Sequence, residues 1–482
     1  MNKEIIGHPQ SFSVRNNPVI SELQSYDLKH VWHPFTRLVD LQMVTQGRAL
    51  PPIVITQAKG AILRDENGNE YLDGNASIWT CLHGHCDEKI IQAICEQLKK
   101  LDHCSSLGLA NEQAALLSKE LVDFLNLPES TRVMLSSDGS SAIEAGLKIL
   151  HLARKLRGEE HRKTFINLCG AYHGDTVGAM SLSHSPQFHE SFKEIMFDTV
   201  QIPAPACYRC PYNRAQPEKG FDARVVRKCN WECVQDLERV ITRHGPQNIN
   251  AVVLEPRVQG AAGFLMHPRG YLKKVFPLLK TNGIWLMCDE ILTGMGRCGP
   301  AIVSLNEDVT PQAIALGKSL SGGVLPLAAT LLDAEVSQPF TGPDSPVFYH
   351  GHSYSCNPPS CAAARASLQL LQTKHNTDYR EKFASLLAEA SKIFWQHKHV
   401  GDVRQEGGIL AIELVEDFFT RKPFPSCLSI AAKVCSKAAE LGLLTRPVAN
   451  SLVLMPPLCA TKEQIQKMCE ILSAAIFEVL EA

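Results

Sequence analysis

The sequence has no long apolar run, no excess of charge of either sign, no internal repeat and no low-complexity segment. Without about 18 consecutive apolar residues a chain cannot form a membrane-spanning helix, and the first residues lack the apolar core of a signal peptide. The 48 Lys and Arg against 50 Asp and Glu leave a net charge of -2, which offers no basic surface for nucleic acid or acidic lipid. We therefore expect a cytoplasmic protein whose partners are small molecules, with no nucleic acid and no membrane.

Cysteine, in contrast, is abundant, with 17 residues among 482. Several cysteines lie inside apolar segments, where a free thiol packs as a small hydrophobic group, so we expect most of them to be reduced. Cys207, Cys210, Cys229 and Cys233 have a C-x2-C and C-x3-C spacing close to that of a structural zinc site. Near-matches of this kind arise readily in a cysteine-rich chain, and we expect no metal.

Short apolar runs alternate with amphipathic stretches through the middle of the chain. These runs are rich in β-branched and aliphatic residues and are apolar on both faces, which is typical of a parallel sheet covered by helices. They lie at residues 132–137, 164–170, 250–256, 284–290, 313–318 and 327–333. Residues 140–157 have the helical spacing of apolar residues behind a serine-rich start. The fold class is therefore predicted to be α/β.

Polar or glycine residues follow five of these runs at their carboxyl ends. Because ligands bind at that edge of an open α/β sheet, we expect these motifs to converge on one site. They are Ser136 to Ser141, Gly170 to Gly174, Glu255, Asp289-Glu290 and Gly317-Lys318. Gly317-Lys318-Ser319 is not a phosphate-binding P-loop, because Gln312 stands where that motif needs glycine.

The chemistry of these residues suggests one cofactor. Gly139 and Ser140 open a helix and suit a phosphate group, while Tyr172 could stack on a flat heterocycle or be ordinary core. A buried Asp289 could pair with a protonated pyridine nitrogen. Lys318 is either a solvated loop residue or a desolvated amine that attacks a carbonyl. Together they fit pyridoxal 5'-phosphate (PLP), with Lys318 as its covalent anchor.

The segment "CDEILTGMGRCG" (288–299), with "ALGKSLSGG" (315–323) after it, resembles the signature of the class III, or ω-type, aminotransferases. Asp289 and Lys318 are 29 positions apart, and the resemblance extends over nearly the whole chain. The motifs "VWHPFTRL", "ASIWTCLHGH", "GAYHGDTVGAMS" and "YHGHSYSCNP" are similar to the branch of this family that converts 7-keto-8-aminopelargonate to 7,8-diaminopelargonate in biotin biosynthesis.

The resemblance implies a homodimer of PLP fold type I with its active sites at the interface. It implies that Gly139 and Ser140 hold the phosphate, Tyr172 lies against the ring, Asp289 pairs with the ring nitrogen and Lys318 bonds to the cofactor. It divides the chain into a large PLP-binding domain with a mainly parallel sheet (76–358) and a small α/β domain built from both termini (1–75 and 359–482).

The resemblance also implies substrate-binding roles. Gly351, His352 and Ser353 would reach across the dimer interface to the neighbouring subunit's phosphate and substrate. Arg446 would bind a substrate carboxylate, and Trp79 would line the channel for a long acyl chain. Arg297 would support donor binding or the charge balance of the site, with a structural salt bridge as the alternative.

Phe35 departs from the family pattern, because members that use S-adenosylmethionine typically carry tyrosine there. We expect S-adenosylmethionine as the amino donor, with lysine as the alternative donor for the same acceptor. Two further functions fit the motifs less well: an aminotransferase of the ω-amino acid:pyruvate or ornithine type and, outside enzymes, a zinc-stabilised binding module.

Overall fold

The computed structural model describes residues 20–46, 49 and 51–481. Residues 1–19, the start of the predicted small-domain segment 1–75, lie outside the described part. Within that part, no helix combines the length and apolar character needed to cross a membrane.

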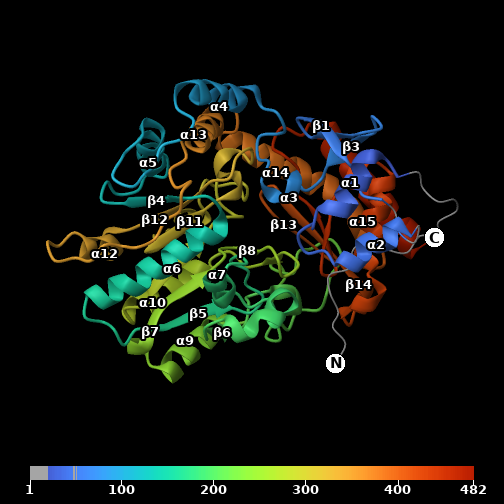
Figure 1. Ribbon diagram of the computed structural model, residues 1–482. Coiled ribbons are helices and arrows are strands. Elements are labelled where there is room, and N and C mark those ends of the chain that lie inside the picture. Colours follow the sequence, from blue (N-terminus) through green and yellow to red (C-terminus); the bar gives the residue numbers. More distant parts are fainter. Residues whose placement is uncertain (1–19, 47–48, 50, 482) are drawn as a thin grey trace.

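A seven-stranded sheet forms the centre of the larger half of the molecule (Figure 1). All six predicted apolar runs are strands of this sheet, and its four central strands, β12, β11, β10 and β7, are buried along their whole length. β12 is antiparallel to both of its neighbours, and the other pairings are parallel, which confirms the mainly parallel sheet. In spatial order the strands are β4 (Arg132–Ser136), β12 (Ala328–Leu332), β11 (Ala313–Leu316), β10 (Trp285–Asp289), β7 (Ile249–Leu254), β5 (Thr164–Leu168) and β6 (Val200–Ile202).

Helices cover both faces of this sheet because alternate strand residues point to opposite sides. Val253 and Met287 pack in one core cluster with α6 (Gly139–Leu156) and α7 (Val177–Leu182). Leu254 and Leu286 pack in another with α9 (Glu232–His244) and α10 (Tyr271–Thr281). Figure 1 shows α6 running across one face of the sheet.

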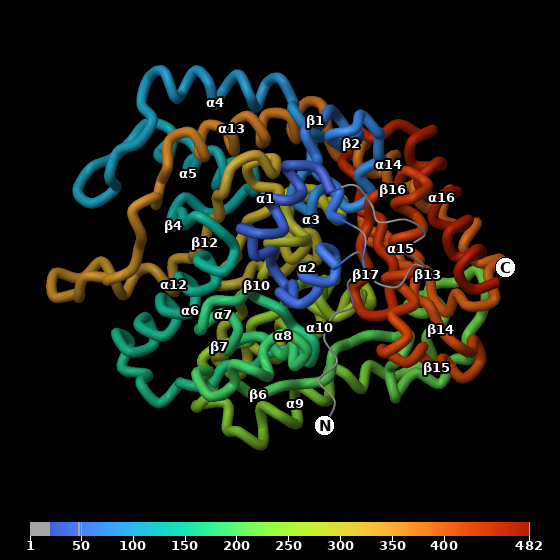
Figure 2. Tube along the Cα trace, turned by 45° about the vertical axis from the view of Figure 1, so that its right-hand side comes forward, coloured from blue at the N-terminus to red at the C-terminus, as the bar shows by residue number. Residues whose placement is uncertain are grey.

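The smaller half combines segments from both ends of the chain, as Figure 2 shows by the blue and red tubes that lie together. A parallel pairing of β3 with β16 joins them within the sheet β1-β2-β3-β16. The strands of this half are β1 (Ile55–Lys59), β2 (Ile62–Asp65), β3 (Glu70–Asp73), β13 (Val400–Glu406), β14 (Ile409–Asp417), β15 (Lys422–Pro423), β16 (Leu443–Leu444), β17 (Pro447–Val448) and β18 (Ser451–Leu454). Its helices are α1 (Glu22–His30), α2 (Leu38–Thr45), α14 (Thr377–Ser391), α15 (Ile430–Glu440) and α16 (Lys462–Leu480), and α16 begins with a Thr461–Gln464 capping box.

α13 (Pro358–Thr373) packs against α4 (Glu88–Lys100) and α5 (Glu112–Phe124) beside the large sheet. The division at 358/359 falls at the start of α13, and the domain boundaries stay a prediction. The remaining elements are α3 (Ala76–Trp79), α8 (Pro186–His189), α11 (Val303–Asn306), α12 (Ala334–Ser337), β8 (Val258–Gln259), β9 (Leu265–Met266) and the 3-10 helices η1 (Glu190–Ile195), η2 (Cys207–Arg209), η3 (Pro246–Asn248), η4 (Lys318–Ser321), η5 (Gln338–Phe340), η6 (Lys392–Gln396) and η7 (Ser426–Leu428).

Candidate active site

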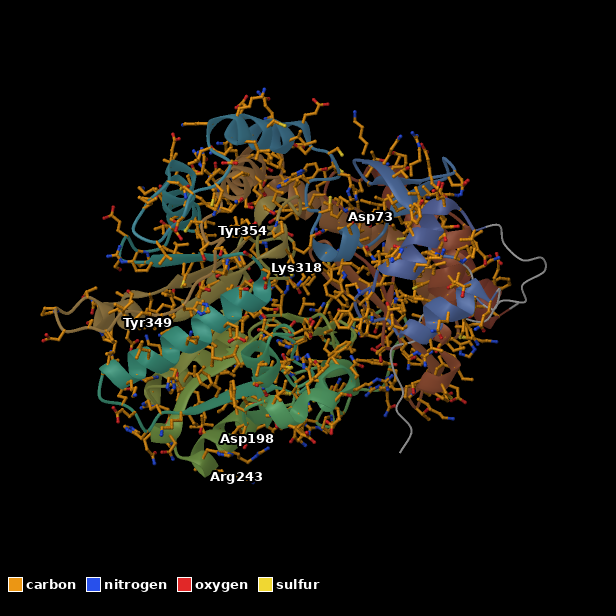
Figure 3. All side chains as sticks on the ribbon, viewed as in Figure 1. Asp73, Asp198, Arg243, Lys318, Tyr349 and Tyr354 are labelled. Atoms are coloured by element: carbon orange, nitrogen blue, oxygen red, sulfur yellow. The ribbon has the colours of Figure 1, made fainter. Side chains whose placement is uncertain are left out.

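The five strand-end motifs meet at one edge of the large sheet. β4, β5, β7, β10 and β11 all run in the same direction, so their carboxyl ends lie together. Asp289 pairs with Ala315 on the neighbouring strand, and Lys318 follows three residues later at the start of η4. Figure 3 shows Lys318 in the middle of the molecule, between the sheet and the half built from both ends of the chain.

The amine of Lys318 is partly buried and forms no hydrogen bond or ion pair within the described residues. Burial lowers the pKa of this amine, although the carboxylates of Asp289 and Glu255 oppose the shift. Its Nζ lies 5.7 Å from the ring centroid of Trp79. A desolvated amine with a lowered pKa is suited to act as a nucleophile and as a base.

Asp289 is 5% exposed and is paired with a histidine that the sequence analysis did not assign. Its Oδ2 lies 2.7 Å from Nδ1 of His173, and its Oδ1 accepts a hydrogen bond from the backbone N–H of Ile291 at 3.1 Å. Burial alone would lower the pKa of His173, but the hydrogen bond and charge of Asp289 outweigh it and raise that pKa. The position of His173, directly after Tyr172 at the end of a strand, is the signal that could have found it.

Glu255 is a second buried acid near the amine. Its carboxylate accepts backbone hydrogen bonds from Tyr172 and Gly260, both at 3.1 Å. Burial raises the pKa of Glu255 to about 7. Glu255 stands at a predicted strand end with no role assigned from the sequence, and its contact with the backbone of Tyr172 fixes the two strand ends to each other.

The amino end of α6 is a crowded, glycine-lined turn. Asp138 caps the helix by accepting from the N–H of Ser141 at 2.9 Å. A Cβ added at Gly139 would lie 2.9 Å from Ile291, and one added at Gly174 would lie 2.1 Å from Oγ of Ser140. Only glycine fits at these positions, which leaves backbone N–H groups at the start of an 18-residue helix for an anion. The turn therefore fits the predicted phosphate site.

The exposed segment Gly351, His352 and Ser353 lies beside this turn within the same chain. The backbone N–H of Ser137 donates to Nε2 of His352 at 3.2 Å. Ser353 makes no hydrogen bond within the described residues. The predicted reach of this segment across a dimer interface stays a prediction.

A row of aromatic rings connects Tyr172 to the N-terminal segment. The ring centroids are 5.8 Å apart for Tyr172 and Phe188, and 5.6 Å apart for Phe188 and Phe35. The hydroxyl of Tyr172 donates to Asp175 at 2.7 Å, and its ring stacks on His189 at 5.8 Å. Phe35 is 46% exposed, so it lies at the mouth of the site rather than in the core.

Trp79 ends a left-handed turn, residues 76–79, in which all four non-glycine residues have φ between 47° and 72°. This conformation costs an L-residue roughly 1–2 kcal/mol, and it is least favourable for a β-branched residue such as Ile78. The Trp79 ring packs edge-to-face on Phe264 with centroids 5.0 Å apart. Strain of this kind persists only where the surroundings hold it, and it concentrates at functional sites.

Two arginines predicted to bind substrate have different surroundings. Arg446 is partly buried and has no acidic partner among the described residues, and it lies near enough to Tyr172 to interact with it electrostatically. Arg297 is fully buried and donates to the carbonyl oxygens of Pro456 (3.0 Å) and Cys81 (3.3 Å). The structural salt bridge suggested as an alternative for Arg297 is not formed within the described part of the chain.

All 17 cysteines are free thiols. Cys207, Cys210, Cys229 and Cys233, whose spacing is close to that of a zinc site, are near enough to interact electrostatically, and burial raises the pKa of Cys207 to about 12. No three His, Cys, Asp or Glu side chains among the described residues are placed to hold a metal ion. The structure therefore gives no support to the zinc interpretation.

Residues 43–476 match the family model described as Aminotransferase class-III. The adenosylmethionine-8-amino-7-oxononanoate aminotransferase of Geobacter sulfurreducens is 37% identical over 459 residues, which are 95% of this chain and 98% of that protein. The crystal structure of the enzyme of that name from Methanocaldococcus jannaschii has a TM-score of 0.86 at 34% identity, and the match covers 95% of this chain and 99% of that one. An amine transaminase from an uncultivated Pseudomonas species, in its PLP-bound form, has a TM-score of 0.84 at 29% identity, with 94% and 99% of the two chains covered.

Proposed function

Since the chain belongs to the class-III aminotransferases, we propose that it transfers an amino group from S-adenosylmethionine to 8-amino-7-oxononanoate (7-keto-8-aminopelargonate), the step of biotin biosynthesis that yields 7,8-diaminopelargonate. The chain is a PLP-dependent enzyme of fold type I, and this membership gives no support to the zinc-stabilised binding module. The names of the relatives support the choice of acceptor and donor over the ω-amino acid:pyruvate and ornithine types.

PLP fits the residues of the site. Gly139 and Ser140 would hold its phosphate, because a Cβ is excluded at Gly139 and the helix start is open to an anion. Asp289 would hold the proton on the ring nitrogen, since its second carboxylate oxygen accepts only one backbone N–H. Tyr172 would lie against the ring, and Lys318 would be its covalent anchor. When bound, PLP supplies an electron sink that stabilises negative charge on the substrate carbon.

The residues of the chain supply the proton transfers of this ping-pong reaction. Lys318 takes the proton from the donor carbon through Nζ, and burial, which lowers the pKa of its amine, favours the neutral form that acts as a base. His173 keeps the Asp289 carboxylate oriented through the 2.7 Å contact. Trp79 and Phe264 form an apolar wall that excludes water beside the amine.

One observation carries the choice of a long keto acid as acceptor: the Arg446 guanidinium has no acidic partner among the described residues, although it is partly buried. A partly buried arginine without an anion has lost hydration that a substrate carboxylate can replace with two parallel hydrogen bonds. Trp79 supplies the apolar surface for the chain of the acceptor. Gly351 and Arg297 are proposed to support substrate binding, Arg297 by fixing the backbone at Cys81.

The donor is tested by the residue at position 35. Phe35 presents a ring near Phe188 but no hydroxyl, which is the one observation that favours lysine as the donor. Purified enzyme should convert 8-amino-7-oxononanoate to 7,8-diaminopelargonate with S-adenosylmethionine, detected by mass spectrometry. Product with lysine alone would reassign the donor, and no product with either donor would contradict the proposed function.

A homodimer is supported by one exposed apolar face. Leu107 is 91% exposed, Tyr349 84%, Tyr354 65% and Leu109 63%, and Figure 3 shows Tyr349 on the side of the large half away from the small half, with Tyr354 nearer the centre, above Lys318. Patches of large apolar side chains on a surface mark protein contacts. His352 and Ser353 lie in the same segment, so we propose that this face pairs two copies and that the two residues complete the partner's phosphate site. Light scattering should give twice the 53.1 kDa of one chain.

We further propose a cytoplasmic location, which the 17 free thiols support.

A further inference from the structure

The left-handed turn is fixed by Asp73, the last residue of β3, which is 1% exposed. Oδ1 of Asp73 accepts from the backbone N–H groups of Asn75 and Ser77, both at 3.2 Å. Oδ2 accepts from the hydroxyl of Ser77 at 3.1 Å and contacts Nε2 of His85 at 2.8 Å. One carboxylate is thus hydrogen bonded at four points, and three of the donors belong to the entry of the turn.

His85 ties the two flanks of the turn together. Its ring contacts Asp73 before the turn and lies near enough to the thiol of Cys81 after it to interact with it electrostatically. Its backbone exchanges two hydrogen bonds with Gly60, at 2.8 and 2.9 Å, which anchors it to the β1–β2 hairpin. The carbonyl of Cys81 also accepts from Arg297. The turn therefore begins and ends on fixed points.

The far side of the turn faces the reacting amine. Trp79 lies with its ring centroid 5.7 Å from Nζ of Lys318 and packs close to Gly260. Thr80, the next residue, lies against Gly323 in the loop after Lys318 so closely that a Cβ there would be 2.4 Å from the Thr80 backbone. Figure 3 shows that Asp73 and Lys318 come from different segments, Asp73 from the N-terminal part and Lys318 from the central sheet.

We propose that Asp73 and His85 are positioning and specificity residues: their ion pair holds residues 76–79 in the left-handed turn that places Trp79 against Lys318, and so sets the fit of the acceptor chain. The reason is geometric. If the turn relaxes to right-handed or extended backbone, the Cα–Cβ bond of Trp79 points elsewhere and the apolar wall beside the amine is lost. This inference rests on the proposed function for its substrate, but the position of Trp79 can be tested without any substrate.

Asp65 provides a matched control in the same sheet. It ends β2 as Asp73 ends β3, is 6% exposed, and also receives four hydrogen bonds, from the N–H groups of Asn67 and Asn69 and the side chains of Asn69 and Tyr71. These contacts stay within residues 67–71. Asp65→Asn therefore removes the same chemistry without touching the turn that carries Trp79.

The kinetic test compares Asp73→Asn with Asp65→Asn. Misplacing a group by about 1 Å can cost up to about a hundredfold in catalysis, so we expect Asp73→Asn to raise KM for 8-amino-7-oxononanoate by about tenfold or more, with kcat at saturation changed less than about threefold. Asp65→Asn should leave KM within about twofold. Equal effects of the two variants, or an unchanged KM in Asp73→Asn, would overturn the proposal.

The double variant Asp73→Asn/Trp79→Leu distinguishes positioning from general support. If Asp73 acts through Trp79, the double variant should match Trp79→Leu alone within about twofold in KM. Independent roles would multiply the two effects, and that result would contradict the proposal. His85→Leu should also raise KM. His85→Gln, which keeps an N–H to donate to Asp73, should raise KM less than His85→Leu does.

Near-ultraviolet circular dichroism tests the same point without substrate. The difference between wild type and Trp79→Leu defines the Trp79 signal, and Asp73→Asn should lose that signal while Asp65→Asn keeps it. If the wild type does not convert 8-amino-7-oxononanoate, the proposed function fails, whereas the dichroism result still decides whether Asp73 positions Trp79. A retained Trp79 signal in a folded Asp73→Asn variant would overturn the inference.

Discussion

The structure contains two aspartate–histidine pairs, each with a buried aspartate, and their contact distances are almost equal. Asp289 contacts His173 at 2.7 Å at the end of the central sheet, and Asp73 contacts His85 at 2.8 Å at the edge of the small half. In both pairs the aspartate ends a β-strand, and the hydrogen bond raises the pKa of the histidine against the effect of burial. The contact distance alone therefore does not distinguish their roles.

The difference lies in what else each carboxylate binds. Asp289 has, besides His173, only the backbone N–H of Ile291 as a hydrogen-bond donor among the described residues, so it retains acceptor capacity for a ligand. The carboxylate oxygens of Asp73 already accept or share four hydrogen bonds, with Asn75, Ser77 and His85. The comparison teaches that a buried carboxylate with spare acceptor capacity can act on a bound group, whereas a saturated one fixes the backbone.

The largest expected effect on activity is at Lys318. Lys318→Ala should lower turnover by about 10³-fold or more, because general acid–base catalysis alone is worth about 10²–10⁴-fold and the covalent anchor is also lost. The Tm should stay within a few degrees of wild type, about 5 °C at most. Steady-state kinetics with a thermal melt as control checks this, and a variant with a tenth of wild-type turnover would rule out Lys318 as the reacting amine.

Asp289→Asn should lower kcat by about 10²–10⁴-fold, equivalent to about 3–5 kcal/mol of barrier, because an amide cannot keep the ring nitrogen protonated. The same change at Asp73 should act on KM instead, which is the sharpest contrast between the two pairs. Kinetics of both variants under identical conditions provides the measurement. If Asp289→Asn keeps most of its kcat, Asp289 has a structural role like that of Asp73, and the proposed difference between the two pairs is wrong.

The pH dependence of stability tests the charge on His85. Its pKa is raised from 6.5 to about 10, so its ion pair stabilises the fold fully below pH 6.5 and loses that effect as the pH rises through 10. The charged and titratable groups near the pair are Asp73, Cys81 and Arg297. The difference in Tm between wild type and His85→Gln should be largest below pH 6.5 and narrow toward pH 10. A difference that widens with pH would show that His85 is neutral in the folded protein.

The smallest expected effect is at the mouth of the site, outside both pairs. One neutral hydrogen bond contributes about 0.5–1.5 kcal/mol, so Phe35→Tyr should raise kcat/KM for S-adenosylmethionine by at most about tenfold. Activity with lysine should not change. A wild type that already works better with lysine, and a variant that gains with S-adenosylmethionine, would assign lysine as the natural donor.

Most of the large sheet and the central site could be predicted from the sequence because their signals are local. Strands such as β10 are apolar on both faces, and the polar residue that follows each strand must lie at the carboxyl edge. The amino-acid pattern alone therefore places Asp289 and Lys318 together. The serine-rich start of α6 is equally clear, because Gly139 and Ser140 follow a strand and open a helix.

The two histidines could not be assigned because their partners are set by tertiary structure. His173 lies in a predicted strand-end motif, but its partner Asp289 is 116 residues away. His85 lies in a segment that contributed only to the family resemblance. The left-handed turn contradicts local preferences, since sequence rules expect glycine where φ is positive and residues 76–79 contain none. The carboxylate of Asp73 and the ring of His85, which the fold places beside the turn, support this conformation.

Reduction with borohydride followed by peptide mapping tests the central claim most directly. Purified enzyme loaded with PLP should absorb visible light, lose that absorbance on reduction, and yield the cofactor mass on the peptide that contains Lys318. Lys318→Ala, treated in parallel, should carry no label. A label on another lysine, or none on the wild type, would contradict the account.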